Sequence, residues 1–335
     1  MNDFAFSTAS GVSETFVADG HRVALIAGGT ELLNWMRLGI ADPQKVVDIS
    51  RLENMDAIWI QDGYLVIGSL ATLNSIGENS LVVEHARTLA QACLSAASPQ
   101  VRNRATLGGN VLQKTRCAYF RAEEPLPWAC NKRHSETGCA ARFGLNERHA
   151  IFGWTDVCVA VQPSDPAVAL ACLDAEAQVQ GFAGCRTIAM SEFHFSQAEA
   201  VGVGGDPAKL ENQLRPSELI VSYRIPVRPE MRSAYVKVRE RASYEYALVS
   251  AAAAVIMDQD RISHARIALG SVAQKPWRLF AAEGMLEGKR LTVEDLAPTI
   301  DAALSDAKPL TRNAFKVPLA RNAAIRAILL AGAKA

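Results

Sequence analysis

Four of the chain's seven cysteines lie between Arg102 and Asp165, in a stretch with many arginines and lysines and few long apolar runs. Such a segment has little apolar surface with which to form a core, so a bound group is needed to hold it in one conformation. Four thiolates that close on one metal centre would do this, because the free energy of metal binding becomes free energy of folding. The candidate ligands are Cys117, Cys130, Cys139 and Cys158.

The spacing of these cysteines bears on the kind of centre they could hold. Zinc sites with four cysteines usually present tight pairs, about two to four residues apart, whereas 12, 8 and 18 residues separate successive cysteines here. Iron–sulfur clusters are also held by four thiolates. The spacing therefore favours a cluster, and it leaves open a zinc site or four buried free thiols. The other three cysteines are expected to be ordinary core residues: Cys93, Cys172 and Cys185.

A glycine turn near the N-terminus forms a second candidate site. A strand is predicted over residues 21–26, ending at Ala27-Gly28-Gly29-Thr30, and a helix over 31–37 and a strand over 46–49 follow. This unit can present backbone N–H groups and a helix N-terminus to a phosphate. It is neither a Rossmann fingerprint nor a Walker loop, and a turn that needs glycine only for its geometry is the alternative.

Three further positions could contact a cofactor. The segment Thr106-Leu107-Gly108-Gly109-Asn110 predicts a second glycine turn, where backbone could approach a ligand without an intervening Cβ. Asp165 precedes a predicted helix and could serve as its N-cap or as a cofactor ligand. Lys237 lies on an alternating strand, a pattern that is usually a solvated sheet face.

Together these motifs resemble the FAD-binding subunits of the molybdenum hydroxylases, which include xanthine dehydrogenase, aldehyde oxidoreductase and carbon monoxide dehydrogenase. The resemblance rests on T-L-G-G-N, R-C-x-Y-F, C-N-K-R, G-C-A-A and H-A-I-x-G, followed by a further Cys and P-S-D. The cysteine-rich insert is similar to that of the bacterial aldehyde oxidoreductase type, which carries a 4Fe–4S cluster. This resemblance implies the cluster, with all four cysteines named above as its ligands. One difference is Gln162, where relatives commonly have His.

The resemblance also implies FAD. It assigns the pyrophosphate to the first glycine turn, the diphosphate and ribityl chain to the second, sugar hydroxyls to Asp165, and the isoalloxazine surroundings to Lys237. The implied FAD-binding residues are Ala27, Gly28, Gly29, Thr30, Glu31, Leu32, Thr106, Gly108, Gly109, Asn110, Asp165 and Lys237. Beside the cysteines, Arg116, Lys132 and Arg133 are expected to favour the thiolate forms.

Composition excludes several classes of protein. The 335 residues carry a net charge of +0, with 49% apolar and 21% charged residues, which is typical of a globular protein and gives no basis for binding nucleic acid. No apolar run is long enough to span a membrane. The first residues lack the pattern of a signal peptide. Cytoplasmic residence is therefore expected, with periplasmic residence through a signal-bearing partner subunit as the alternative.

The predicted fold class is α+β. It comprises an FAD-binding domain of the PCMH (vanillyl-alcohol oxidase-like) type with two α+β subdomains, then a C-terminal α/β domain with a small antiparallel sheet packed on helices. The domains are expected over residues 1–226, with the cluster insert at about 112–160, and over 227–335. Helices are also expected over 9–19 and 81–97.

The sequence contains no nucleophile–base constellation and no H-E-x-x-H, so a bound cofactor is expected to supply the chemistry. The implied function is that of an electron-transfer subunit. It would work with a molybdenum-cofactor-binding large subunit, a small subunit with 2Fe–2S clusters and an external electron acceptor. A stand-alone flavin oxidoreductase and a zinc-stapled, non-redox binding module are the alternatives.

Overall fold

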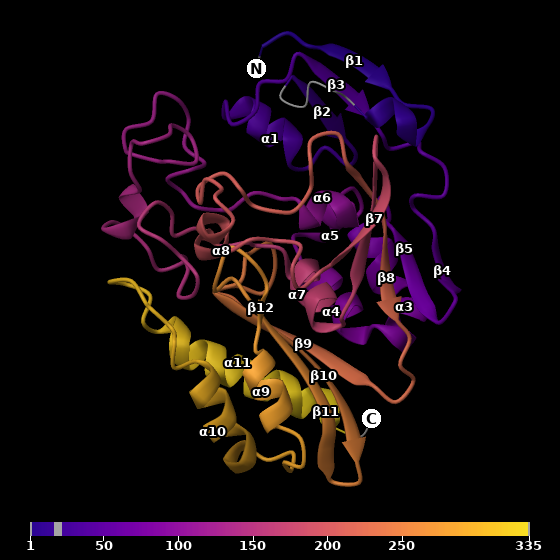
Figure 1. The fold of residues 1–335 in the computed structure, drawn as a ribbon, viewed down its shortest axis with the longest axis vertical. Helices are drawn as coiled ribbons and strands as arrows, with labels where there is room; N and C mark the ends of the chain where they lie inside the picture. The colour runs from indigo at the N-terminus through magenta and orange to yellow at the C-terminus, as the bar shows by residue number, and fades with distance from the viewer. Residues whose placement is uncertain (1, 17–21, 334–335) are drawn as a thin grey trace.

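The computed structural model describes residues 2–16 and 22–333 (Figure 1). Its N-terminal elements are β1 (Ala5–Thr8), η1 (Val12–Thr15), β2 (Val23–Ile26), α1 (Leu32–Arg37) and β3 (Lys45–Asp48). The strands form a parallel sheet in the order β1-β3-β2. Parallel neighbours need a crossover connection, which α1 supplies between β2 and β3. Leu32 and Met36 of α1 are buried with Val46 of β3, so the predicted strand–turn–helix–strand unit is confirmed, apart from residue 21 of the predicted first strand, which lies outside the described part.

The central part of the chain is a five-stranded antiparallel sheet. Its strands are β4 (Ile58–Gln61), β5 (Tyr64–Gly68), β6 (Glu176–Gly181), β7 (Gly184–Ala189) and β8 (Leu219–Pro226). They lie in the order β4-β5-β8-β6-β7. Short helices share one core with this sheet: α2 (Leu73–Glu78), α3 (Ser80–His85), α4 (Arg87–Ser95), α5 (Pro99–Arg102), α6 (Leu107–Val111) and α7 (Asp165–Cys172).

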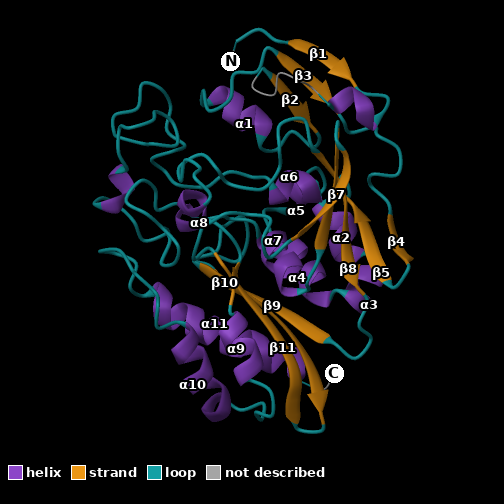
Figure 2. Ribbon diagram, viewed as in Figure 1, coloured by secondary structure: helices purple, strands orange, loops and turns teal. Residues whose placement is uncertain are grey.

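The C-terminal part is a second antiparallel sheet with helices. Its elements are β9 (Arg232–Val238), β10 (Val249–Asp258), β11 (Arg261–Gly270), β12 (Trp277–Arg278), α9 (Phe280–Met285), α10 (Val293–Ala303) and α11 (Lys316–Gly332). Four alanines in β10 alternate between two cores. Ala251 and Ala253 face the core that includes α11, whereas Ala252 and Ala254 face the core of the central sheet. Small side chains on both faces of this strand let helices pack closely on each side (Figure 2).

The insert at residues 112–160, all of which the structure describes, is almost entirely irregular (Figure 2). Its one helical element is the 3-10 turn η2 (Ala140–Arg142), and Cys130 and Cys139 face each other in an isolated β-bridge. It contributes few buried apolar side chains, as its composition predicts, and leaves Phe143 81% exposed.

The predicted fold class is confirmed, but three element predictions are wrong. In place of a helix over 9–19 the chain forms only the short η1, and residues 17–19 of that prediction lie outside the described part. The helix predicted over 81–97 is divided at Ala86 into α3 and α4. The second glycine turn is helical, since Gly108 and Gly109 belong to α6. No helix in the described ranges is both long and apolar enough to cross a membrane.

Candidate cofactor-binding site

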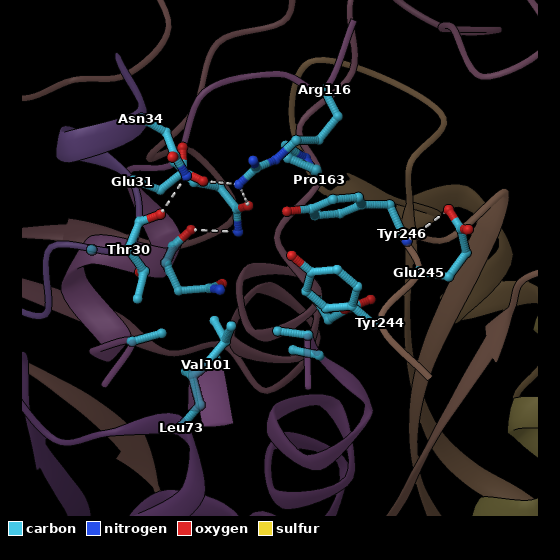
Figure 3. A pocket seen from close by; sticks show the side chains of 17 residues that line it. Thr30, Glu31, Asn34, Leu73, Val101, Arg116, Pro163, Tyr244, Glu245 and Tyr246 are labelled. Atoms are coloured by element: carbon cyan, nitrogen blue, oxygen red, sulfur yellow. Dashed lines mark hydrogen bonds and ion pairs between the residues drawn. The ribbon is translucent and has the colours of Figure 1, made fainter. Parts of the chain in front are cut away.

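Two adjoining pockets lie between the first glycine turn and α6. One, of about 360 Å³, extends from α1 to α7 and the loop between β9 and β10 (Figure 3). The other, of about 280 Å³, lies against β2, the glycine turn and α6. The two share Thr30, Glu31 and Gly109 as lining residues. All the sequence-predicted FAD-binding residues line one pocket or the other, except Gly108 and Lys237.

The first glycine turn is packed against backbone. A Cβ on Gly28 would lie 1.8 Å from the carbonyl oxygen of Arg104, so only glycine fits there. Gly29 has a φ of +74°, in the left-handed region that favours glycine. The turn therefore needs glycine for its geometry, and its two glycines also line the smaller pocket.

Helix α6 begins beside this turn. The Thr106 hydroxyl caps it by accepting a hydrogen bond from the Gly109 N–H at 3.3 Å, so this oxygen is already engaged within the protein. Gly108 packs against Ser69, where a Cβ would come within 3.2 Å of the Ser69 side chain. Asn110 faces the larger pocket, and its Oδ1 accepts a hydrogen bond from Ser164 Oγ at 2.7 Å.

Asp165 is the first residue of α7, and the N-cap is Ser164. The Asp165 carboxylate accepts hydrogen bonds from Tyr235 Oη at 2.6 Å and from Lys237 Nζ at 2.7 Å. Burial and the Asp165 charge hold the pKa of Tyr235 well above its usual value. Lys237 thus lies behind Asp165, away from both pockets, whereas Asp165 itself lines the larger one. The pairing of Lys237 with Asp165 was not predicted, and a solvated face is the wrong interpretation for this lysine, whose side chain is 3% exposed.

Glu31 connects the glycine turn to the start of the insert. Its carboxylate forms ion pairs with Arg116 and Arg121 and accepts a hydrogen bond from Trp35 Nε1 at 2.8 Å. The Arg116 guanidinium lies over the Tyr246 ring, 4.5 Å from the centroid (Figure 3). Burial lowers the pKa of Arg116 to about 10.

The loop between β9 and β10 supplies residues that sequence reasoning missed. Tyr244 and Tyr246 project into the larger pocket opposite Thr30 and Asn34 (Figure 3). The available signal was two aromatic residues in the polar segment Arg-Ala-Ser-Tyr-Glu-Tyr, where no core periodicity requires them. Arg116, which the sequence places only beside Cys117, also lines this pocket.

These residues fit FAD. The turn and α6 offer glycine backbone for close approach to a diphosphate, and the larger pocket combines apolar walls with Asn110, Asp165 and the tyrosines. Arg116 Nε is buried and has no hydrogen-bond partner among the described residues, so a polar ligand group could satisfy it.

The four cysteines of the insert converge. Cys117, Cys130, Cys139 and Cys158 line one small cavity of about 10 Å³. The described residues include no group of three or more His, Cys, Asp or Glu side chains arranged to hold a single metal ion. A tetrahedral zinc site needs its sulfurs at about 2.3 Å from one point, whereas a four-iron cluster is wider and its ligands stand farther apart.

The prediction that Arg116, Lys132 and Arg133 favour the thiolate forms of the cysteines is largely wrong. Burial raises the pKa of Cys117 to about 12, and it also raises the pKa values of Cys130 and Cys139. A charge on Cys158 would raise the pKa of each of these three thiols further, which reflects their proximity. The pKa of Cys130 is lowered only weakly by Lys132.

The two arginines are engaged elsewhere. Arg116 faces Glu31, and Arg133 donates to backbone carbonyls, including that of Phe120 at 2.9 Å. Lys132 is directed to Glu211, with Nζ 2.7 Å from Oε1. Thiolates at this cavity would therefore depend on a bound cation.

The remaining cysteines divide into two groups. Cys93 and Cys172 are fully buried, as predicted for core residues, and burial raises the pKa of each thiol. Cys185 is exposed on β7, so its prediction as a core residue is wrong.

Comparison with known proteins gives matches over almost the whole chain. Residues 4–228 match the FAD binding domain in molybdopterin dehydrogenase, and residues 234–331 match the CO dehydrogenase flavoprotein C-terminal domain. The chain is 38% identical over 299 residues to the aldehyde oxidoreductase FAD-binding subunit PaoB of Escherichia coli, covering 88% of this chain and 87% of that protein. It is 25% identical over 291 residues to the carbon monoxide dehydrogenase medium chain of Hydrogenophaga pseudoflava, covering 87% of this chain and 81% of that protein.

Solved structures have the same fold. A carbon monoxide dehydrogenase from Hydrogenophaga pseudoflava superposes with a TM-score of 0.74 at 24% identity, covering 98% of this chain and 97% of that chain. The match of the family model over residues 4–228 and the extent of the similarity to PaoB establish the relationship. This chain belongs to the family of FAD-binding subunits of the molybdenum hydroxylases.

Proposed function

We propose that this chain is the electron-transfer subunit of an aldehyde-oxidising molybdenum hydroxylase and that it holds a 4Fe–4S cluster in addition to FAD. Bound FAD supplies one- and two-electron redox chemistry, and a cluster supplies one-electron chemistry. The observation that carries the cluster is the convergence of four thiols, from separate loops, on one cavity. The similarity to the PaoB aldehyde oxidoreductase subunit supports the substrate class.

The residues between the two sites have a defined part in this proposal. Cys117 of the cavity directly follows Arg116, which lines the larger pocket and pairs with Glu31 of the glycine turn. The chain thus holds the two sites in a fixed relation through a pair of adjacent residues. Close and fixed spacing of redox centres is what an electron-transfer subunit requires.

For FAD we assign the glycine turn and α6 to the diphosphate and the larger pocket to the flavin side. Asp165 is proposed to accept hydrogen bonds from sugar or ribityl hydroxyls, while Tyr235 and Lys237 orient its carboxylate. Lys237 therefore acts through Asp165 in this proposal.

The proposed partners are a molybdenum-cofactor-binding large subunit, a small subunit with 2Fe–2S clusters and an external electron acceptor. Several relatives are named as medium chains or FAD-binding subunits, which supports a multi-subunit complex. Residence in the cytoplasm, or in the periplasm through co-export with a partner, is part of the same proposal, and fractionation of cells that express the whole complex tests it.

The decisive experiment measures iron, sulfide and FAD in the complex after anaerobic purification. We expect about four irons and four sulfides per chain beyond those of the partner subunits. Cys130→Ser should remove them, and Cys93→Ser, which changes a buried thiol that does not line the cavity, should not. Equal iron in both variants, or zinc in place of iron, would refute the cluster. FAD that is not reduced when an aldehyde is added to the complex would refute the substrate class.

A further inference from the structure

A buried histidine contacts one of the four thiols. His149 Nε2 lies 3.2 Å from Cys117 Sγ, and the residue is 5% exposed. Its other ring nitrogen, Nδ1, is buried and has no hydrogen-bond partner among the described residues. A neutral imidazole carries one N–H. A proton on Nδ1 would make no well-aligned hydrogen bond there, whereas a proton on Nε2 can be donated to the sulfur, so the surroundings favour the Nε2–H tautomer.

The backbone around His149 is fixed by the C-terminal domain. The His149 carbonyl accepts hydrogen bonds from Lys316 Nζ at 2.8 Å and Asn313 Nδ2 at 3.1 Å. Ile151 and Phe152, two and three residues further along the chain, are buried in the core that includes α11. The ring is therefore held beside Cys117 by backbone that is anchored in the C-terminal core.

We propose that His149 is a positioning residue that donates its Nε2–H to the Cys117 thiolate and thereby raises the reduction potential of the cluster. The inference rests on the proposed 4Fe–4S site. A hydrogen bond to a ligand sulfur withdraws negative charge, and it is stronger when the cluster is reduced and more negative. Removal of the donor should therefore make the cluster harder to reduce without removing a ligand.

Two substitutions of similar length separate hydrogen bonding from packing. His149→Gln keeps an N–H donor near the position of Nε2, and His149→Met has no donor. In the purified complex, EPR-monitored redox titration should show the ratio of reduced to oxidised cluster falling about ten-fold at a fixed potential in His149→Met. That change corresponds to a shift of about 59 mV to lower potential for one electron. His149→Gln should retain most of the wild-type potential, and both should keep the iron content of the wild type.

A second buried histidine provides the control. His194 is 1% exposed and its Nε2 lies 2.9 Å from the carbonyl oxygen of Val111, with no thiol involved. His194→Met should leave the cluster potential unchanged. Equal potentials in wild type, His149→Gln and His149→Met would overturn the inference while leaving the cluster intact. Absence of iron from the wild-type chain would overturn the cluster and the inference together.

A measurement on the wild type does not depend on the folding of any variant. In complex labelled with ¹⁵N-histidine, pulsed EPR of the reduced cluster should detect a weak nitrogen coupling transmitted through the hydrogen bond. A strong coupling would identify His149 as a direct iron ligand, and no coupling would exclude the hydrogen bond. Either of these two results would overturn the inference.

Discussion

The backbones of Gly28 and Arg104 are in direct contact. A Cβ added to Gly28 would lie 1.8 Å from the Arg104 carbonyl oxygen. The glycine turn after β2 and the segment that leads into α6 are thereby held against each other. These segments form the two sides of the smaller pocket, so its shape depends on the absence of a single methyl group.

Gly28→Ala should therefore yield protein with little FAD. The added methyl group must push the two segments apart, which should cost about 1–3 kcal/mol or more of the free energy of unfolding. The absorbance of bound flavin per chain measures the loss. Gly284→Ala is the control, because a Cβ there meets nothing within 4 Å and helix α9 accepts alanine. Full flavin content in Gly28→Ala would contradict the assignment of this turn.

Lys237→Met should destabilise the fold. The Lys237 and Asp165 side chains are 3% and 5% exposed, so removal of the ammonium leaves a buried carboxylate without its counter-charge, at a cost of about 3–5 kcal/mol. Unfolding in urea measures this loss. The double variant Asp165→Asn/Lys237→Met should lose less free energy of unfolding than Lys237→Met alone, because it leaves no unpaired buried charge. Arg321→Met, which breaks the exposed pair with Asp301, should cost less than about 1 kcal/mol.

The buried carboxylate of Glu211 should make the free energy of unfolding depend on pH. Burial alone would raise its pKa, but the ammonium groups of Lys132 and Lys114 outweigh burial and lower the pKa of Glu211 to about 2. Since the folded-state pKa lies below the ordinary value of 4.5, the stabilisation is complete above that value and is lost as the pH falls towards 2. When the pH is lowered from about 5 to about 3, the free energy of unfolding should fall by about 2 kcal/mol more in the wild type than in Glu211→Gln. Urea unfolding at the two pH values measures this difference. An equal fall in the free energy of unfolding of the wild type and the variant would contradict the prediction.

Tyr246→Leu should weaken FAD binding about ten-fold. The substitution removes an aromatic wall of the larger pocket and the ring on which Arg116 lies, a contact of about 0.5–2 kcal/mol. Flavin titration of FAD-depleted protein measures the dissociation constant. Tyr64→Leu removes a similar contact, with Arg224 3.9 Å from the ring centroid, at a site that lines neither pocket. Equal FAD affinities in the two variants would refute the role of Tyr246.

The sequence predicts the local parts of this site better than the long-range ones. The strand, glycine turn and helix that end at Arg37 are adjacent in the chain, so periodicity and glycine placement suffice. Thr106 to Asn110 looks like a turn because glycine is a poor helix former, yet the Thr106 cap and the packing of Gly108 on Ser69 make it helical.

Contacts between distant segments leave no local pattern. Glu211 and Lys132 are 79 residues apart, and neither lies in a motif that predicts the other. Tyr246 reaches the pocket because β9 and β10 form a hairpin beside α4, and only the tertiary fold gives that placement. A ligand role for the four cysteines is implied by the family resemblance alone, because their spacing leaves a zinc site and free thiols open.

The anchoring of His149 by Lys316 and Asn313 affects the order in which the chain can mature. During synthesis the domains of a protein fold from the N-terminus onwards, so the cysteines emerge from the ribosome long before the first turn of α11. Until then the His149 carbonyl lacks both of these donors, and the wall of the thiol cavity is incomplete. On the proposal that this cavity holds a cluster, completion of α11 would have to precede stable loading of iron.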